Sequence, residues 1–327
     1  MSLPLGAFGL LAFSGRANHN QARVDLCERN ARHFARDDWW FLAFRGWAHV
    51  ENGAVSHGRG LTEQGLSLRR ANANAAHALS HAMFEAGAAA EAEAFIKDWL
   101  PSYDRAGTMH GHISWHAALA ALERGDADGA LAIYTENVQP SVTHALPLNV
   151  VSDSVSLLWR LHAYGHEVPT GLWEAARTYA KAYYDKPGFS FADVHMGLLA
   201  AAIDDRQEAT DRIDALLRLV EAGTLAAGPV VPAICRAALA FVDQDYALCS
   251  RILEPVAPEV VRIGGSGAQR EIVEDTLLQA YIRAGETEKA RALLESRLHR
   301  RPSHRDMTWH AALVPAAMHS KSAATLI

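Results

Sequence analysis

The amino-acid sequence predicts an all-α fold made of stacked helical hairpins. Half of the 327 residues are apolar, with Ala and Leu dominant and β-branched runs scarce, which favours helices over strands. Apolar residues recur with helical periodicity in segments of about 15 residues. No two short segments of alternating polarity flank a tight turn, so nothing indicates a β-hairpin. We therefore expect one helical domain covering residues 1–327.

Residues 1–36 are expected to form leading helices. The segment MSLPLGAFGLLAFSGR contains an apolar run that no Lys or Arg precedes and that is too short to cross a bilayer. A packed first helix explains it better than a signal peptide does. The three cysteines, Cys27, Cys235 and Cys249, are far apart and lack C-x-x-C spacing. They are typical of buried residues or free thiols in a reducing compartment, so the expected location is the cytoplasm.

Residues 37–140 carry the clearest repeat pattern. Amphipathic segments end in Gly, the residue that a helix C-terminus in the left-handed conformation needs, at Gly53, Gly87 and Gly125, and again at Gly285. Three of them precede an Ala-rich amphipathic segment: AAAEAEAFIKDWL, DADGALAIYTENV and ETEKARALLESRL. This alternation is typical of tetratricopeptide-type repeats. The sequence thus predicts an α-α superhelix of degenerate tetratricopeptide-type hairpins.

Residues 141–327 are expected to form looser helical repeats. A long apolar segment that begins near Leu146 carries Asp153, and a later helical segment, FADVHMGLLAAAIDD, carries Asp193 and His195. These polar residues interrupt apolar segments, where each would need a partner. Further along, two glycines break the chain before Ser266, which we expect to be the N-cap of the next helix.

Two histidine pairs of equal spacing form the strongest candidate site. HALSH contains His77 and His81, and HISWH contains His112 and His116, 35 residues further on. Residues four apart share one face of a helix, so each pair directs two imidazoles to one side. A separation of 35 residues is about one helical hairpin. Two neighbouring helices can therefore direct four imidazoles into one groove.

Two interpretations of the tetrad remain open. In the first it is a metal or cofactor site, because neutral imidazoles at this spacing can ligate one ion, with Asp153, Asp193 and His195 as further candidates. His77, His81, His116 and Asp153 are then the candidates for catalysis, and His112 and Trp115 for ligand binding. In the second, the histidines form hydrogen bonds between helices and Trp115 packs beside them. The cofactor is unknown in either case, and a divalent metal is a candidate.

Motifs that would name a reaction are absent from the sequence. No Glu follows the first histidine of either pair as in H-E-x-x-H, and there is neither a G-x-S-x-G motif nor a phosphate-binding glycine loop. The segment GGSGAQR has the glycines without a following Lys-Ser/Thr pair.

That same segment, GGSGAQR, places a cation in the first turn of a predicted helix. Arg270 there opposes the helix dipole, which indicates a partner of opposite charge. One interpretation is an anion or carboxylate clamp formed by Ser266, Gln269 and Arg270. The other is a buried ion pair from Arg270 to Asp153 or Asp193.

Several motifs together resemble the tetratricopeptide repeat protein 38 family. They are H-A-x-x-H-x-M-x-E-x-G from His77, H-x-x-W-H-x-A-L from His112, V-x-D-S-x-S-L-x-x-R-L from Val151, F-x-D-x-H from Phe191 and G-G-S-x-A-Q-R from Gly264. The resemblance implies an all-α repeat array and no settled biochemical activity. Longer members carry additional N-terminal helices, so we expect the first hairpin to be uncapped or covered by a second subunit, which allows a homo-oligomer.

Charge and motif content lead to two functional hypotheses. The formal charge is −6, with acids and bases interleaved, so neither nucleic acid nor an anionic membrane is an expected partner. The first hypothesis is a non-catalytic helical-repeat protein whose His-lined concave pocket binds a small ligand, a peptide or a protein. The second is an enzyme, with or without a metal, in which the His cluster acts with Asp and Arg residues on a small acidic substrate.

Overall fold

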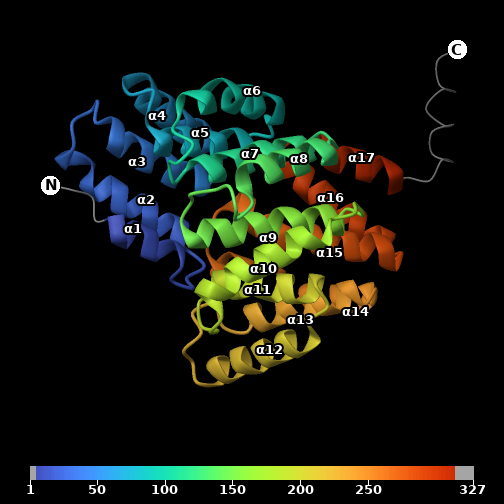
Figure 1. The fold of residues 1–327 in the computed structure, drawn as a ribbon. Helices are drawn as coiled ribbons and strands as arrows, with labels where there is room; N and C mark the ends of the chain where they lie inside the picture. Colours follow the sequence, from blue (N-terminus) through green and yellow to red (C-terminus); the bar gives the residue numbers. More distant parts are fainter. Residues whose placement is uncertain (1–4, 314–327) are drawn as a thin grey trace, which may run out of the picture.

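The computed structural model describes residues 5–313, and within them the chain forms helices and no strand (Figure 1). The all-α prediction is therefore confirmed. Two helices lead the chain, α1 (Leu5–Ala12) and α2 (His19–Asn30). The hairpins that follow are α3 (Trp39–Glu51) with α4 (Val55–Leu68), α5 (Ala73–Glu85) with α6 (Ala89–Trp99), α7 (His110–Glu123) with α8 (Ala127–Ile133), and α9 (Pro147–Ala163) with α10 (Thr170–Tyr184).

The second half of the chain continues the same alternation. Its hairpins are α11 (Ser190–Ala202) with α12 (Arg206–Glu221), α13 (Val230–Val242) with α14 (Tyr246–Leu253), and α15 (Gly267–Ala284) with α16 (Thr287–Arg300), followed by α17 (His304–Leu313). Gly53, Gly87, Gly125 and Gly285 all have positive φ angles, so their predicted left-handed conformation is confirmed. The loops can turn sharply because glycine has no Cβ to clash in that conformation.

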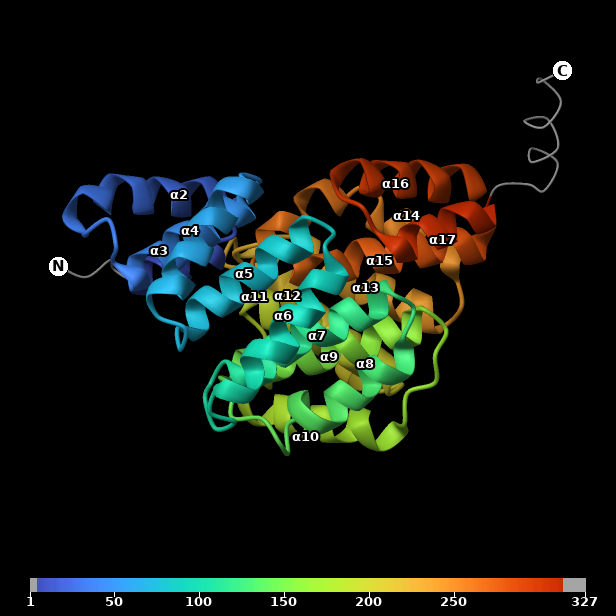
Figure 2. The same cartoon turned by 90° about the horizontal axis from the view of Figure 1, so that it is seen from above.

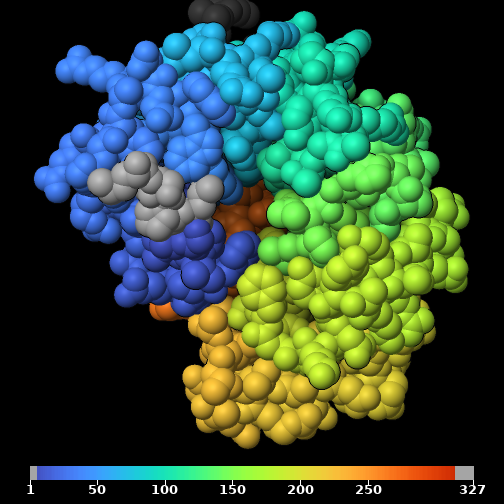
Figure 3. Space-filling view, turned by 60° about the vertical axis from the view of Figure 1, so that its left-hand side comes forward, coloured from blue at the N-terminus to red at the C-terminus, as the bar shows by residue number. Residues whose placement is uncertain are grey.

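The first helices of successive hairpins pack side by side. Contacts join α3 to α5, α5 to α7, α7 to α9, and onward to α15. In Figure 2 the leading helices and the C-terminal helices α16 and α17 lie at opposite ends of this series. Helix α15 also contacts α5 and α9, so it lies against the inner side of the series. Figure 3 shows the dark-orange C-terminal part of the chain at the bottom of a surface hollow between the blue and green parts.

The leading helix α1 packs as the sequence predicts, although residues 1–4 of that segment lie outside the described residues. Phe8 is buried, and its ring lies 5.5 Å from Phe44 and 5.6 Å from Trp47.

The three cysteines are all buried free thiols. Within residues 5–313, no helix has both the length and the apolar character that crossing a membrane requires.

A glycine turn brings the N-terminus of α15 to the inner side of the fold. Gly264 and Gly265 have φ angles of +92° and +75°, and a Cβ on Gly264 would lie only 2.6 Å from the carbonyl oxygen of Ala12. Ser266 then caps α15, and the side chain of Gln269 binds back to the N–H of Ser266. The predicted N-cap is confirmed, and this capping box fixes where α15 begins.

Candidate functional site

The four predicted histidines converge in the core between α5 and α7. His77, His81, His112 and His116 are each at most 4% exposed, and one ring nitrogen from each lies within 4.8 Å of the other three. The Nε2 atoms of His77 and His81 are 2.8 Å apart, and those of His77 and His112 are 3.1 Å apart. The i, i+4 spacing on each helix and the packing of α5 on α7 together produce this cluster.

Two buried carboxylates bind the outer nitrogens of the cluster. Asp153, on α9, lies 2.8 Å from Nδ1 of His112, and Glu51, the last residue of α3, lies 3.0 Å from Nδ1 of His81. Both carboxylate side chains are at most 2% exposed. Metal-binding histidines usually donate their second N–H to such a carboxylate, which fixes the ring and its tautomer.

This arrangement leaves lone pairs directed at one another. Nδ1 of His112 donates to Asp153, so the neutral ring keeps a bare lone pair on Nε2, and the carboxylate of Glu51 beside Nδ1 of His81 favours the same tautomer there. Both lone pairs face Nε2 of His77, which carries at most one proton. Hydrogen bonding therefore satisfies at most one of these two lone pairs.

The electrostatics favour neutral rings. Burial, followed by the neighbouring imidazoles, holds the pKa of His77 and of His116 well below the usual histidine value. Burial also lowers the pKa of His81, although Glu51 opposes it. These three rings are thus neutral at pH 7, and neutral imidazole is the form that ligates metal ions.

His116 differs from the other three histidines. Both of its ring nitrogens are buried without a hydrogen-bond partner among residues 5–313. Its ring lies 4.5 Å from that of His81 and 5.0 Å from that of Trp115. Trp115 is fully buried and also stacks on His112, so it forms a wall of the cluster, as Trp47 does beside His77.

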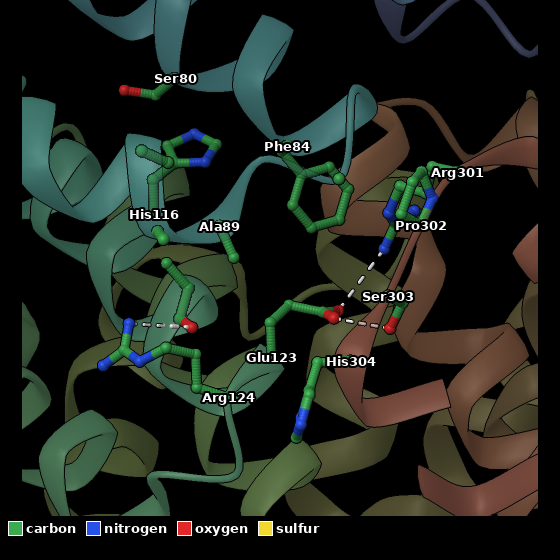
Figure 4. A pocket seen from close by; sticks show the side chains of 14 residues that line it. Ser80, Phe84, Ala89, His116, Glu123, Arg124, Arg301, Pro302, Ser303 and His304 are labelled. Carbon is green, nitrogen blue, oxygen red and sulfur yellow. Dashed lines mark hydrogen bonds and ion pairs between the residues drawn. The ribbon is translucent and has the colours of Figure 1, made fainter. Parts of the chain in front are cut away.

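A cavity of about 240 Å³ reaches His116 from the side of α6. Figure 4 shows His116 and Phe84 at this cavity, with Glu123, Arg301 and Ser303 across from them. Glu123 accepts a hydrogen bond of 2.6 Å from Ser303 and lies 3.6 Å from Arg301. The cavity is therefore mostly apolar, with a histidine at one side and a neutralised charge pair at the other.

The GGSGAQR segment supports the cluster from behind. The backbone N–H of Gly267 donates to Oε2 of Glu51 at 2.8 Å, so the carboxylate at the N-terminus of α15 is bound by the backbone and not by the side chains of Ser266, Gln269 and Arg270. Gln269 donates to Ser152 at 3.5 Å, and Ser152 donates to Asp153 at 3.2 Å. Through these contacts, one helix N-terminus positions both carboxylates that hold the histidines.

Arg270 does not form either ion pair considered from the sequence. Its guanidinium donates to the carbonyl of Gly265, and it makes no ion pair within residues 5–313. Asp153 binds His112 instead, and Asp193 binds Arg212 at 2.7 Å. Arg270 also lines a second cavity and not the one beside His116.

The structure separates two of the predicted metal ligands from the tetrad. Asp193 accepts from Arg212 and from the N–H of Gly188 at 2.8 Å, so each of its oxygens already has a partner away from the tetrad. His195 binds the carbonyl of Phe191, one turn back on its own helix, at 2.7 Å. Neither belongs to the group of four, because α11 packs on α9 and α13 and not on α5 or α7.

Sequence reasoning missed Glu51, although a signal was present. Glu51, Glu85 and Glu123 each stand two residues before a helix-ending glycine, in E-N-G, E-A-G and E-R-G. A negative charge at a helix C-terminus opposes the dipole, so a repeated acid there requires a specific partner.

Compared with models of known protein families, the chain matches none.

Proposed function

We propose that this protein binds one divalent transition-metal ion through the Nε2 atoms of His77, His81 and His112, with His116 between the ion and the apolar cavity. The observation that carries the proposal is the convergence of those three atoms, two of them on rings whose Nδ1 faces a buried carboxylate. Imidazole ligands suit Zn, Cu, Fe and Ni.

The distances and charges support a metal ion. In a tetrahedral site with metal–nitrogen bonds of about 2.0–2.1 Å, ligand nitrogens lie about 3.3 Å apart. The observed separations of 2.8 and 3.1 Å need only a small expansion to reach that value. A divalent ion would also balance the charges of Glu51 and Asp153, neither of which is within ion-pair distance of a Lys or Arg in residues 5–313.

Metal titration tests this function directly. The chelator-treated protein is titrated with Co²⁺, whose visible absorption reports tetrahedral nitrogen coordination, and with Zn²⁺ followed by elemental analysis. We expect one ion per chain in the wild type and none in His112→Ala. His195→Gln is the matched control, because His195 is equally buried but lies outside the cluster. Failure of the wild type to retain an ion would refute the proposal.

The repeat type and the partners belong to the same proposal. Pairing of helices in hairpins, with the first helices packed in series, supports a tetratricopeptide-type superhelix like that of the family the motifs resemble. The apolar cavity beside His116 supports binding of a small molecule, and a peptide, a protein partner or a second copy of the chain remains a proposal. The buried free thiols support a cytoplasmic location.

The second candidate function is catalysis, and the position of His116 favours it. A fourth protein ligand closes a structural site, whereas a catalytic site keeps one coordination position open. The ring of His116 lines the cavity, and neither of its buried nitrogens has a hydrogen-bond partner within residues 5–313, so a small ring movement would let it transfer a proton to or from a bound molecule. Two arginines, Arg124 and Arg301, line this cavity and are placed to meet an acidic substrate, whereas Arg270 lines the other cavity.

Anion binding to the Co²⁺ form distinguishes the two roles. If the position facing the cavity is open, added azide shifts the visible spectrum of the wild type, and His116→Ala still holds the ion. If His116 is a fourth ligand, azide has no effect on the wild type and His116→Ala changes the spectrum by itself.

A further inference from the structure

A second cavity, of about 280 Å³, contains one unpaired charge of each sign. It lies between α5, α15, α16 and the turn after α14, and three Arg and three Glu line it: Arg270, Arg300, Arg301, Glu85, Glu271 and Glu274. Four of them are paired with each other: Arg300 with Glu274 at 2.5 Å, and Arg301 with Glu271 at 2.8 Å. Glu85 and Arg270 are left over.

Neither of these two residues finds a partner within residues 5–313. Arg270 donates only to the carbonyl of Gly265, and Glu85 forms no hydrogen bond or ion pair. They influence each other's protonation at a distance but are too far apart for an ion pair. Both side chains are partly buried at the cavity, and an unpaired charge that has lost part of its hydration favours a ligand group of opposite sign.

The Glu85 carboxylate lies against the backbone of α15 at the cavity. A Cβ on Gly267 would lie 2.5 Å from Oε1 of Glu85, so the carboxylate rests directly on the first residue of α15. Arg270 follows one turn later on the same helix. The acid and the base therefore both line the cavity, and Pro258, Val261 and Leu277 add apolar surface to it.

From these two unpaired charges we propose that the second cavity binds a small zwitterion that carries an apolar group. Apolar α-amino acids are the ligand class that fits this description. The ligand carboxylate binds Arg270, its ammonium binds Glu85, and its side group lies on the apolar wall. The lining has equal numbers of acids and bases, so an overall neutral ligand matches it better than an anion or a cation does. This site adjoins the histidine cluster through Gly267, which lines the cavity and donates to Glu51, but the proposed ligand contacts do not require a metal.

Calorimetry with matched ligands tests the proposal on the full chain, with and without chelator. The probes are L-leucine, L-valine and L-phenylalanine, compared with 4-methylpentanoate and 3-methylbutylamine, which each carry one charge of leucine. We expect at least one amino acid to bind with a Kd below about 1 mM, and both single-charge analogues to bind at least about tenfold more weakly.

Two variants and a control assign the charges. Arg270→Gln and Glu85→Gln should each weaken amino-acid binding about tenfold or more, and Glu85→Gln should abolish the preference for leucine over 4-methylpentanoate. Arg300→Gln, whose arginine lines the same cavity but is paired with Glu274, should leave binding within about twofold. If a variant does not fold, the ligand series on the wild type decides alone. The proposal is wrong if no amino acid binds saturably, or if the single-charge analogues bind equally well.

Discussion

Asp153 shows how much of the histidine cluster depends on a single carboxylate. Its oxygens accept from His112 at 2.8 Å and from Ser152 at 3.2 Å, and its side chain is 2% exposed. The acceptor determines which nitrogen of His112 carries the proton and therefore which nitrogen faces the other rings.

Replacing this acceptor with a residue of similar size should weaken metal binding without creating a cavity in the core. In Asp153→Asn the amide can present an N–H to Nδ1 of His112, which favours the wrong tautomer. We expect Zn²⁺ affinity to fall by about 10- to 100-fold, measured by competition with a chelator of known affinity. Ser156→Ala, one turn further along α9, is the control and should bind Zn²⁺ as the wild type does. Unchanged affinity in Asp153→Asn would contradict the assigned role of Asp153.

The metal-free cluster should make stability depend on pH. The pKa values of His77 and His116 are lowered in the folded state, so the unfolded chain binds more protons below its own histidine pKa of about 6.5. The contribution of these residues is therefore fully present above pH 6.5 and is lost as pH falls, by up to about 1.4 kcal/mol per pH unit for each histidine. Urea unfolding of the chelator-treated protein between pH 5 and pH 7 measures this slope.

The variant His116→Phe measures the contribution of His116 alone to this pH dependence. Its slope between pH 5 and pH 6 should be smaller than that of the wild type by about 1.4 kcal/mol per pH unit. Phenylalanine fills a similar volume and does not titrate. An identical slope in both proteins would show that His116 is charged in the folded state.

Three helix ends in succession present an acid to the C-terminal part of the chain. Glu51 ends α3 and accepts from Gly267, Glu85 ends α5 and lies on Gly267, and Glu123 ends α7 and accepts from Ser303. The repeat places each acid at an equivalent position, so a single surface of the array meets α15 and the segment before α17.

Of these acids, only Glu85 lacks a compensating partner within residues 5–313, and its pKa reflects this. Burial, followed by repulsion from Glu51, raises the pKa of Glu85 to about 7. The unfolded state ionises this carboxyl near its usual pKa of about 4.3, so the penalty appears as pH rises through that range and is complete above pH 7. We expect Glu85→Gln to raise the free energy of unfolding at pH 8 by about 1–2 kcal/mol and to have little effect at pH 4, measured by urea unfolding. A destabilised variant at pH 8 would show that Glu85 is paired.

At the scale of the whole molecule, a buried network of arginines and acids connects α15, α16 and α17. Arg297 is 2% exposed and contacts Glu271 at 2.6 Å, Asp275 at 3.0 Å and Asp306 at 2.6 Å. Asp275 also binds Arg160 of α9 at 3.1 Å. These contacts hold the C-terminal helices against the inner side of the first repeats, where α15 supports the histidine cluster.

Breaking this network should destabilise the entire chain. Arg297→Met removes one charge and leaves three buried acids short of a partner, so we expect a loss of about 3–5 kcal/mol in the free energy of unfolding. Denaturant unfolding followed by circular dichroism measures it. Arg291→Met, on the same helix but in partly exposed pairs with Glu288 and Glu295, should cost no more than about 1 kcal/mol.

Helices, their glycine ends and the convergence of the tetrad were predictable from the sequence, because they depend on residues close together in the chain. The periodicity of apolar residues defines a helix, a left-handed glycine ends it, and the spacing of four places His77 over His81. A repeat of about 35 residues then places the next pair beside the first.

The partners of buried polar residues were decided by the packing of distant segments. Gly267 meets Glu51 across 216 positions of the chain, and no local pattern encodes that meeting. Asp193 and Asp153 look alike in the sequence, since both interrupt apolar helices, yet one neutralises Arg212 and the other holds His112. Burial makes an unpaired charge costly, so each group takes the partner that the folded chain brings within reach.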